Sequence, residues 1–287
     1  RMSQQIPATV PYRNKIALVF DFDGTLAPRT HTEVIKRLGF EPAEYEEEYL
    51  KPLQEDGWET VLAMGHIYSK LAKEKELTRD FLEKVGREMP LYDGVEQMFE
   101  TVREAARETN PEIEVEFYLL TAGFTEVPKA TRIAKEFKEI YGGALHFDDQ
   151  GRPEAVKRIL THPEKPLYLL QLAKGFDFAQ ANPRQATEPL DPDEWYIPLD
   201  QMIYVGDGHS DMPAFDLVQR YGGIGLGVFE AERAEDWEGR DKIETIRRVE
   251  NLAPNDYTDG SELLESLLRA THSLCHRVAL RKLGKGE

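Results

Sequence analysis

The sequence predicts an α/β protein with a mainly parallel sheet and an inserted helical domain. Short apolar runs alternate with segments whose apolar residues recur at helical spacing, which is the pattern of parallel β–α units. One long helical block interrupts this alternation directly after the first apolar run. We therefore expect a core domain of residues 1–28 and 91–287 and a helical domain of residues 29–90.

Four apolar runs predict the strands of the core. They occupy residues 15–20, 113–120, 201–205 and 221–229. The first run is continuously apolar, as expected for a parallel strand that is covered on both faces. Residues 144–156 predict a short strand pair around the turn at 149–151, where Gly151 supplies a turn residue.

Apolar residues at helical spacing predict the helices. Beyond the block at 30–90, helices are expected at 91–108, 125–142, 166–175 and 261–283. Gly175 is expected to close the helix at 166–175, and Cys275 is expected to lie in the core. Residues 176–200 carry four prolines and are expected to form a long surface loop.

Composition limits the possible partners. The 287 residues include 36 Lys and Arg against 53 Asp and Glu, for a net charge of −17. This balance argues against nucleic acid or an anionic membrane as the main partner. The single cysteine excludes an internal disulfide, no apolar run is long enough to span a bilayer, and the N-terminus lacks a signal-peptide pattern. We expect a cytoplasmic protein, and the sequence does not predict its oligomeric state.

Four aspartates follow two of the predicted strands. Asp21 and Asp23 lie two residues apart after the first strand and point the same way if the segment is extended. Asp207 and Asp211 follow the third strand in "GDGHSD". Loops at the carboxyl ends of parallel strands converge, so we expect one carboxylate cluster. Such crowding favours a bound hard cation, and oxygen-only ligands select Mg²⁺.

Taken together, "DFDGT", "TAG", Lys165 and "GDGHSD" resemble, in this order, the four motifs of the haloacid dehalogenase superfamily. The helical block resembles the cap of its phosphoserine-phosphatase-like branch, inserted into a Rossmann-like core. The resemblance implies a Mg²⁺-dependent phosphohydrolase that acts through an aspartyl-phosphate. It makes Asp21 the nucleophile and Asp23 the general acid and base. The implied substrate-binding residues are Thr121, Ala122 and Lys165, and the implied metal residues are Asp21, Asp23, Asp207 and Asp211.

Two lysines compete for the place of the phosphate-binding cation. Pro166 suits the first position of a helix, so Lys165 would lie at the positive helix end, where anions bind. Lys174 lies late in the same helix, where a surface lysine is common. Lys165 is therefore preferred, although the loop at 176–200 makes its spacing from the last motif unusually long. His209, inside that last motif, is a further candidate for substrate contact, with a solvated loop residue as the simpler interpretation.

Three functions remain open at this point. A phosphatase that acts on a small phosphomonoester is preferred. A phosphotransferase or phosphomutase would share Asp21 and Asp23, and a catalytically idle binding protein would keep the fold. Asp23 disfavours a dehalogenase, because dehalogenases that resemble this fold lack an acid at that place.

Overall fold

A computed structural model describes residues 12–176, 186–191, 194–230 and 248–284. The described residues form a seven-stranded sheet in the order β4-β3-β2-β1-β5-β6-β7. Neighbouring strands are parallel except β3 and β4, which form an antiparallel pair. The strands are β1 (Lys15–Phe20), β2 (Glu114–Phe124), β3 (Glu139–Phe147), β4 (Pro153–Arg158), β5 (Met202–Gly206), β6 (Ile224–Phe229) and β7 (Asn251–Pro254).

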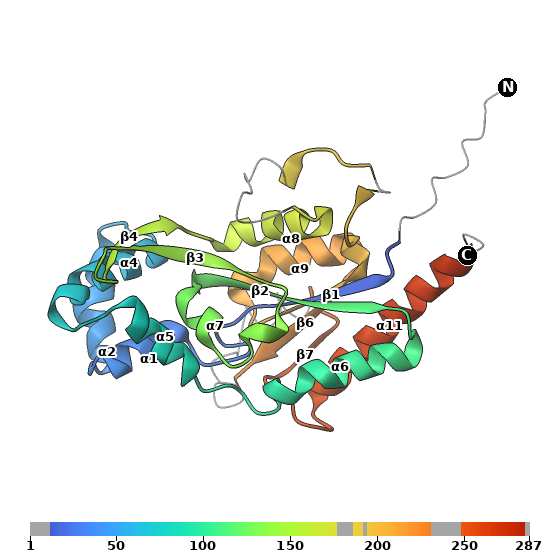
Figure 1. The fold of residues 1–287 in the computed structure, drawn as a ribbon, viewed down its shortest axis with the longest axis horizontal. Helices are drawn as coiled ribbons and strands as arrows, with labels where there is room; N and C mark the ends of the chain where they lie inside the picture. The colour runs from blue at the N-terminus through green and yellow to red at the C-terminus, as the bar shows by residue number, and fades with distance from the viewer. Residues whose placement is uncertain (1–11, 177–185, 192–193, 231–247, 285–287) are drawn as a thin grey trace.

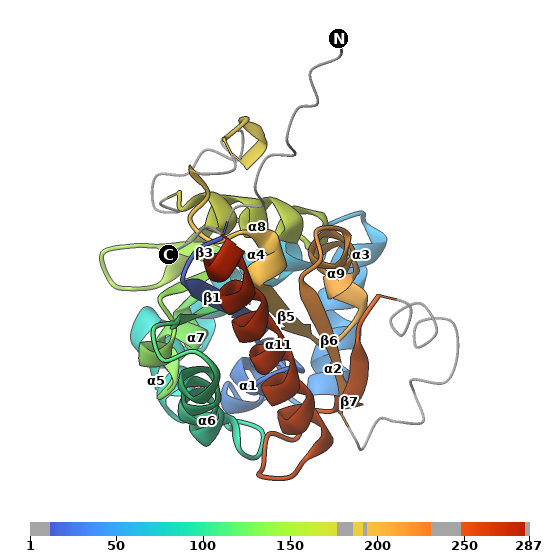
Figure 2. The same cartoon turned by 90° about the vertical axis from the view of Figure 1, so that its right-hand side faces the viewer.

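Helices cover both faces of the sheet (Figure 1, Figure 2). Helices α6 and α11 lie on one face, and α8 and α9 lie on the other. The α-helices of the described residues are α1 (Thr30–Arg37), α2 (Pro42–Tyr45), α3 (Lys51–Glu55), α4 (Thr60–Glu74), α5 (Arg79–Arg87), α6 (Val95–Thr109), α7 (Glu126–Ala130), α8 (Lys165–Lys174), α9 (Met212–Arg220) and α11 (Glu262–Gly284). The predicted α/β class with a parallel core is confirmed.

The central strand β1 explains why its sequence is continuously apolar. Ile16, Leu18 and Phe20 face the cluster that includes residues of α6 and α11. Ala17 and Val19 face the opposite cluster, which includes residues of α8 and α9. Successive side chains of a strand point to opposite faces, so a strand covered on both sides is apolar at every position.

The helices α1 to α5 gather at one end of the molecule, beside the carboxyl end of β1 (Figure 1). The chain enters this group at Thr30 and leaves it after Arg87, before α6 begins. Tyr68 of α4 packs against Phe124 at the end of β2, with ring centroids 5.8 Å apart. The helices therefore contact the same strand ends at which the candidate site lies.

Two expectations about the middle of the chain are corrected by the structure. The helix expected at 125–142 is wrong for most of its length, because α7 ends at Ala130 and β3 begins at Glu139. Thr131 closes α7, since its backbone is extended and its hydroxyl donates to the carbonyl of Pro128 at 2.7 Å. The second correction concerns β2, which continues past Thr121 to Phe124. The strand pair predicted around Gly151 is confirmed, as the antiparallel strands β3 and β4.

The remaining chain follows the predicted order with two additions, helix α9 and strand β7. Gly175 ends α8 in a left-handed conformation, with φ at 73°, as predicted. The strand β7 was not predicted, because it is four residues long and contains Asn251 and Pro254. Of the loop expected at 176–200, residues 177–185 and 192–193 lie outside the described residues.

None of the described helices is long and apolar enough to cross a membrane.

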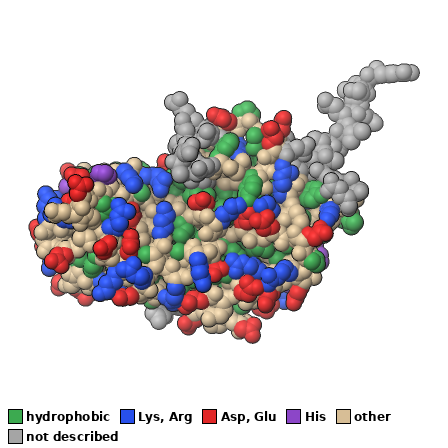
Figure 3. Space-filling model, in the orientation of Figure 1, with side chains coloured by type: hydrophobic (Ala, Val, Ile, Leu, Met, Phe, Trp, Pro, Cys, Tyr) green, Lys and Arg blue, Asp and Glu red, His purple; other side chains and the backbone are tan. Residues whose placement is uncertain are grey.

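Charged side chains of both signs are interspersed over the face shown in Figure 3. Hydrophobic side chains are scattered among them and form no broad patch on this face. The acidic excess of the composition is therefore not concentrated there into a surface of one sign. The buried Cys275 is a residue of α11 and belongs to the core cluster, as predicted.

Candidate active site at the carboxyl ends of the strands

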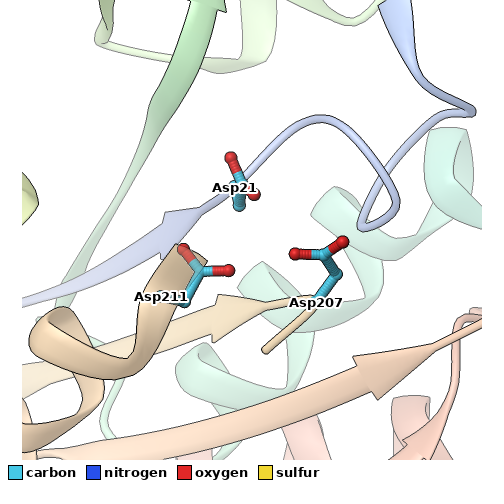
Figure 4. Close-up of side chains that lie close together, drawn as sticks. All are labelled: Asp21, Asp207 and Asp211. Carbon is cyan, nitrogen blue, oxygen red and sulfur yellow. The ribbon is translucent and has the colours of Figure 1, made fainter. Parts of the chain in front are cut away.

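Three of the predicted aspartates meet in one place (Figure 4). Asp21 directly follows β1, Asp207 directly follows β5, and Asp211 is the N-cap residue of α9. The register pairs Phe20 with Val205, so β1 and β5 end side by side. One carboxylate oxygen from each aspartate lies within 4.8 Å of the others.

Two glycines allow this close approach. A Cβ atom on Gly24 would lie 2.6 Å from Oδ2 of Asp207, and one on Gly206 would lie 2.3 Å from Oδ2 of Asp211. Gly24 also has a φ of +75°, which other residues rarely adopt. The glycines that follow Asp23 and precede Asp207 in the sequence are thus required by the packing of the carboxylates.

The cluster is electrostatically strained without a counterion. Burial raises the pKa of Asp21 well above its usual range, and the nearby carboxylates Asp211 and Asp207 add to the effect. Burial, followed by the charge of Asp211, raises the pKa of Asp207 to about 7. Two charges about 4 Å apart repel by about 4 kcal/mol at an effective dielectric constant of 20. Charge neutralisation at this site is therefore strongly favoured.

Lys165 supplies one positive charge. It is the first residue of α8 and is fully buried, with Nζ 3.2 Å from Oδ1 of Asp21 and 2.5 Å from Oδ1 of Asp211. Burial lowers its pKa, but the carboxylates Asp21 and Asp211 outweigh burial and raise it overall. The hydroxyl of Tyr204 also donates to Oδ1 of Asp211, at 2.5 Å. Lys165 therefore stays protonated between two of the three carboxylates.

Lys174 lies at the other end of α8. Its Nζ donates to the carbonyl of Ala186 at 2.7 Å and to the carbonyl of Glu188. The two lysines that the sequence left in competition are therefore separated by the length of the helix, and only Lys165 contacts the aspartates.

Asp23 lies in the same cavity but outside the group of three. Its Oδ1 accepts hydrogen bonds from the backbone N–H of Thr30 at 2.7 Å and from the Thr30 hydroxyl at 2.5 Å. Burial raises the pKa of Asp23, although the hydrogen bonds from Thr30 oppose it. Asp23 therefore favours its protonated form more than an exposed aspartate does. Asp23 is not among the three residues whose carboxylate oxygens lie within 4.8 Å of one another, and its place among the metal residues stays a prediction.

Thr121 and Ala122 lie near the end of β2, beside β1. Thr121 is buried, and its Oγ1 accepts a hydrogen bond from the N–H of Gly123 at 3.0 Å. Both residues line the same cavity as Asp21 and Asp23. The residues predicted at the ends of the first three core strands thus converge on one cavity. The side chain of His209, the remaining candidate, lies outside the described residues.

The cavity has a volume of about 500 Å³. Its walls come from both the sheet and the helices α1, α4 and α5. Sequence reasoning missed most of its lining, which includes Arg29, Thr30, His31, Glu59, Tyr68, Phe124, Glu126 and His162. Arg29 to His31 lie shortly after the first motif, so their position offered a signal. Tyr68 and Glu126 carried none, since only the fold brings them to this cavity.

The residues of the site fit a hard divalent cation. Three carboxylates offer oxygen ligands within a short distance of one another, and oxygen ligands suit Mg²⁺ or Ca²⁺. Lys165 neutralises only part of their charge. Because Gly24 and Gly206 have no side chain, the carboxylates of Asp207 and Asp211 fit against the backbone at these two positions. Asp21, Asp207 and Asp211 are therefore the residues that could hold a metal ion.

Two sequence comparisons give related proteins. A family model described as a haloacid dehalogenase-like hydrolase matches residues 17–216, the range that holds all the predicted site residues. An uncharacterised protein of Borreliella burgdorferi is 22% identical over 277 residues. The match covers 87% of this chain and 94% of that protein.

Comparison with solved structures finds similar folds. A phosphoserine phosphatase structure, an analogue of its phospho-aspartyl intermediate, matches with a TM-score of 0.53 and 17% identity. That match covers 89% of this chain and 98% of the other. A probable phosphoserine phosphatase of Vibrio cholerae matches with a TM-score of 0.58 and 14% identity, over 94% of this chain and 69% of the other. At these identities, the likeness concerns the fold alone.

Proposed function

Because the chain belongs to the haloacid dehalogenase-like hydrolase family, we propose that it hydrolyses a small phosphomonoester with the help of Mg²⁺. The observation that carries this proposal is the buried Lys165, which lies against Asp21 inside an otherwise anionic cluster. A fixed cation beside a carboxylate at a strand end suits a nucleophile that must approach a phosphoryl group.

The first step transfers the phosphoryl group to the protein. A carboxylate oxygen of Asp21 attacks phosphorus, the ester P–O bond breaks, and its electron pair goes to the leaving oxygen. Asp23 gives its proton to that oxygen, which leaves as an alcohol. The raised pKa of Asp23 supports this role, because burial favours the protonated carboxyl that a general acid needs. The product on the protein is an aspartyl-phosphate.

The second step returns the protein to its starting state. The carboxylate of Asp23 takes a proton from water, and the water oxygen attacks phosphorus. The P–O bond to Asp21 then breaks, which releases phosphate and restores the Asp21 carboxylate. The ammonium of Lys165 and the hydroxyl of Thr121 would stabilise negative charge on the phosphoryl oxygens during both steps.

A metal ion would be held by Asp21, Asp207 and Asp211, and when bound it would neutralise charge on the phosphoryl group. The chain's own contribution is to keep these carboxylates close, with glycines at 24 and 206 and with Lys165 as an internal counterion. Thr30 at the start of α1 donates two hydrogen bonds to Oδ1 of Asp23, which orient this carboxyl group.

We further propose that residues 29–90 act as a cap over a core of residues 1–28 and 91–287. Helices α1, α4 and α5 contribute walls to the cavity, including His31, Met64, Tyr68 and Leu82. A cap of this kind would exclude water and contact the leaving group rather than the phosphate. Substrate choice would then depend on these helices.

Hydrolysis of an aryl phosphate tests the proposal. The wild-type protein should release the aryl alcohol and inorganic phosphate in equal amounts, and only when Mg²⁺ is present. Asp21→Asn should abolish turnover. Asp216→Asn is the matched control, because Asp216 is half-exposed on α9 and pairs with Arg248 at the surface. Transfer of the phosphoryl group to an added alcohol instead of water would indicate a phosphotransferase, and no reaction with any phosphate ester would overturn the proposal.

A further inference from the structure

A second cavity of the described residues lies outside the candidate active site. It has a volume of about 850 Å³, which is in the range of small-molecule sites. Helix α5 forms one wall, and α7 with the strands β3 and β4 forms the rest. Helices α5 and α7 lie side by side (Figure 1), so close that a Cβ on Gly86 would lie 2.4 Å from the carbonyl oxygen of Val127. Of the described residues that line this cavity, only Glu126 also lines the candidate active site.

The charge of this cavity is opposite to that of the chain. Its lining has five positive side chains against two negative ones, Glu83 and Glu126, whereas the chain has 53 acidic residues against 36 basic ones. Among the described residues, Arg87 is the only one of the five that forms an ion pair, with Glu83 at 3.6 Å. We call this cavity the basic cleft, after its five exposed cations Arg79, Arg87, Lys129, Lys157 and Arg158.

The second acid of the cleft cancels little of this charge. Burial raises the pKa of Glu126, and the nearby charges of Lys129 and Lys157 oppose burial only in part. Its Oε1 already accepts a hydrogen bond from the N–H of Leu145 at 3.1 Å. Glu126 is therefore a weaker counterion than an exposed glutamate, and the cleft keeps a positive excess.

Both walls turn their cations toward the same space. On α5, Arg79, Glu83 and Arg87 are spaced by four residues, so they share one face of the helix. On β4, Lys157 and Arg158 are consecutive, and consecutive side chains of a regular strand point to opposite faces. The pairing of β4 with β3 skips Lys157, which makes it the extra residue of a β-bulge. A bulge re-aims a side chain, and here both residues line the cleft.

Two of the arginines are held in place by contacts within the protein. The guanidinium of Arg79 lies over the ring of Phe147, 4.4 Å from its centroid. Nε of Arg158 donates to the carbonyl of Gly142 at 3.1 Å, and its terminal nitrogens have no hydrogen bond among the described residues. A guanidinium that is already positioned loses less conformational entropy when it binds an anion.

The lining also limits the shape of the ligand. None of the described residues of the basic cleft is aromatic, so a nucleobase would find no ring to stack on. The apolar part of the lining is small, with Ala130 and Ala144 as its apolar residues. Arginine forks match the oxygens of phosphate groups, and several cations in one cleft suit several linked anionic groups.

We propose that the basic cleft binds a compact polyanion with the chemistry of linked phosphate groups. Arg79 on α5 would bind one end of it, and Lys157 with Arg158 on β4 would bind the other. Because α5 belongs to the helical block and β4 to the sheet, the bound anion would join these two parts of the protein. The proposal does not rest on the hydrolysis proposed above, since it uses none of the aspartates and not Lys165.

Calorimetric titration of the metal-free protein at low ionic strength tests the proposal, in buffer treated with a chelating resin. The probes are inorganic triphosphate, orthophosphate and ATP. We expect triphosphate to bind at one site, about tenfold or more tightly than orthophosphate, because it reaches cations on both walls. ATP should bind within about threefold of triphosphate if the phosphate chain alone is recognised, and more tightly if the source of the chain is a nucleotide.

Substitutions on the two walls locate the site. Lys157→Gln and Arg79→Gln should each weaken triphosphate binding about fivefold or more, since each removes one charge that faces the ligand. Lys84→Gln is the matched control: Lys84 is an exposed residue of α5 that does not line the cleft, and its variant should change the Kd by less than about twofold.

Thermal melting establishes that each variant is folded. No binding of triphosphate, binding no tighter than that of orthophosphate, or triphosphate binding that both Lys157→Gln and Arg79→Gln leave unchanged would overturn the proposal. An effect of Lys84→Gln as large as that of Lys157→Gln would also overturn it, because the attraction would then come from the net charge and not from the cleft.

Discussion

Lys165 Nζ lies 3.2 Å from Asp21 Oδ1, where the start of α8 meets the end of the central strand β1. The lysine is fully buried, and it can be charged there only because carboxylates surround it. It therefore has two roles in our interpretation. It stabilises the folded cluster of acids, and it presents a positive charge where a phosphoryl group would bind.

Lys165→Met should abolish most of the activity while Lys174→Met should not. Loss of one fixed charge donor at a reacting group typically costs about 10² to 10³ in kcat. The substitution also leaves Asp21 and Asp211 without their counterion, so we expect a lower Tm in the absence of Mg²⁺. Lys174 donates to the carbonyls of Ala186 and Glu188 and does not contact the aspartates. Its variant should therefore keep kcat within about threefold of the wild type. Steady-state kinetics and thermal melting measure both effects.

Mg²⁺ should stabilise the folded protein, and Asp207→Asn should weaken that stabilisation. A ligand that binds only the folded state at 100 times its Kd stabilises it by about 2.7 kcal/mol, which corresponds to several degrees in Tm. Without metal at pH 8, Asp207→Asn should be at least as stable as the wild type, because it removes repulsion from a carboxyl group whose pKa is raised to about 7. An identical Mg²⁺ shift in wild type and Asp207→Asn would remove Asp207 from the metal site.

Gly24→Ala should disrupt the site more than it disrupts the fold. The new Cβ would lie 2.6 Å from Oδ2 of Asp207, so that carboxylate must move. A displacement of about 1 Å at a catalytic group can cost 10²-fold in rate. Gly39→Ala is the matched control: Gly39 also has a positive φ, at +89°, but its Cβ would meet nothing within 4 Å. Both variants should lose about 1 to 2 kcal/mol of stability from backbone strain, and only Gly24→Ala should lose activity and Mg²⁺ stabilisation.

The strands and the acids that follow them could be predicted from the sequence because the signal is local. An apolar run that ends in Asp21, and another that ends before Asp207, place both residues at the same edge of a parallel sheet. Pro166 likewise marked the helix start that positions Lys165. In each case, neighbouring residues in the chain determine where the side chain lies.

The rest of the site depends on contacts that the sequence does not display. Tyr68 and Glu126 reach the cavity from elements far apart in the chain, and neither lies in a recognisable motif. The hydrogen bonds from Thr30 that hold Asp23 apart arise from the way α1 begins. The segment at 125–142 misled the prediction because its apolar spacing suits a helix, whereas pairing with β2 makes its last residues a strand.

Glu116→Gln should weaken the resistance of the protein to acid. Burial raises the pKa of Glu116, but hydrogen bonds from Lys138, Tyr118, Tyr196 and Lys15 outweigh it and lower the pKa to about 2. A carboxyl group with a depressed pKa stabilises the folded state above its unfolded pKa of 4.5, and the stabilisation is lost as the pH falls toward 2.

The expected loss at pH 7 is about 1 to 3 kcal/mol, and the stability of the variant should change less between pH 5 and pH 2 than that of the wild type. Urea unfolding at several pH values measures both. Glu114→Gln is the control, because Glu114 pairs with the same Lys15 but is largely exposed, and should cost less than about 1 kcal/mol. An acid transition unaltered by Glu116→Gln would contradict the assignment.

The two aspartates of the first motif should be separable by their covalent chemistry. Asp21 lies against Lys165 and in the carboxylate cluster, whereas Thr30 holds Asp23 outside it. Asp21→Asn removes the nucleophile, so no phosphoryl adduct can form. Asp23→Asn keeps the nucleophile and removes the group that transfers protons, an effect typically worth about 10² to 10⁴ in rate.

Asp23→Asn should therefore accumulate a phosphoryl adduct on Asp21 when it is given an aryl phosphate. The aryl leaving group needs little protonation, so formation of the adduct should survive better than its hydrolysis, for which Asp23 must take a proton from water. Rapid acid quench followed by intact-protein mass spectrometry detects the adduct, and peptide mapping locates it. The double variant, in which Asp21→Asn is added, should carry none. An adduct on a Ser, Thr or His, or one that persists without Asp21, would rule out the aspartyl-phosphate mechanism.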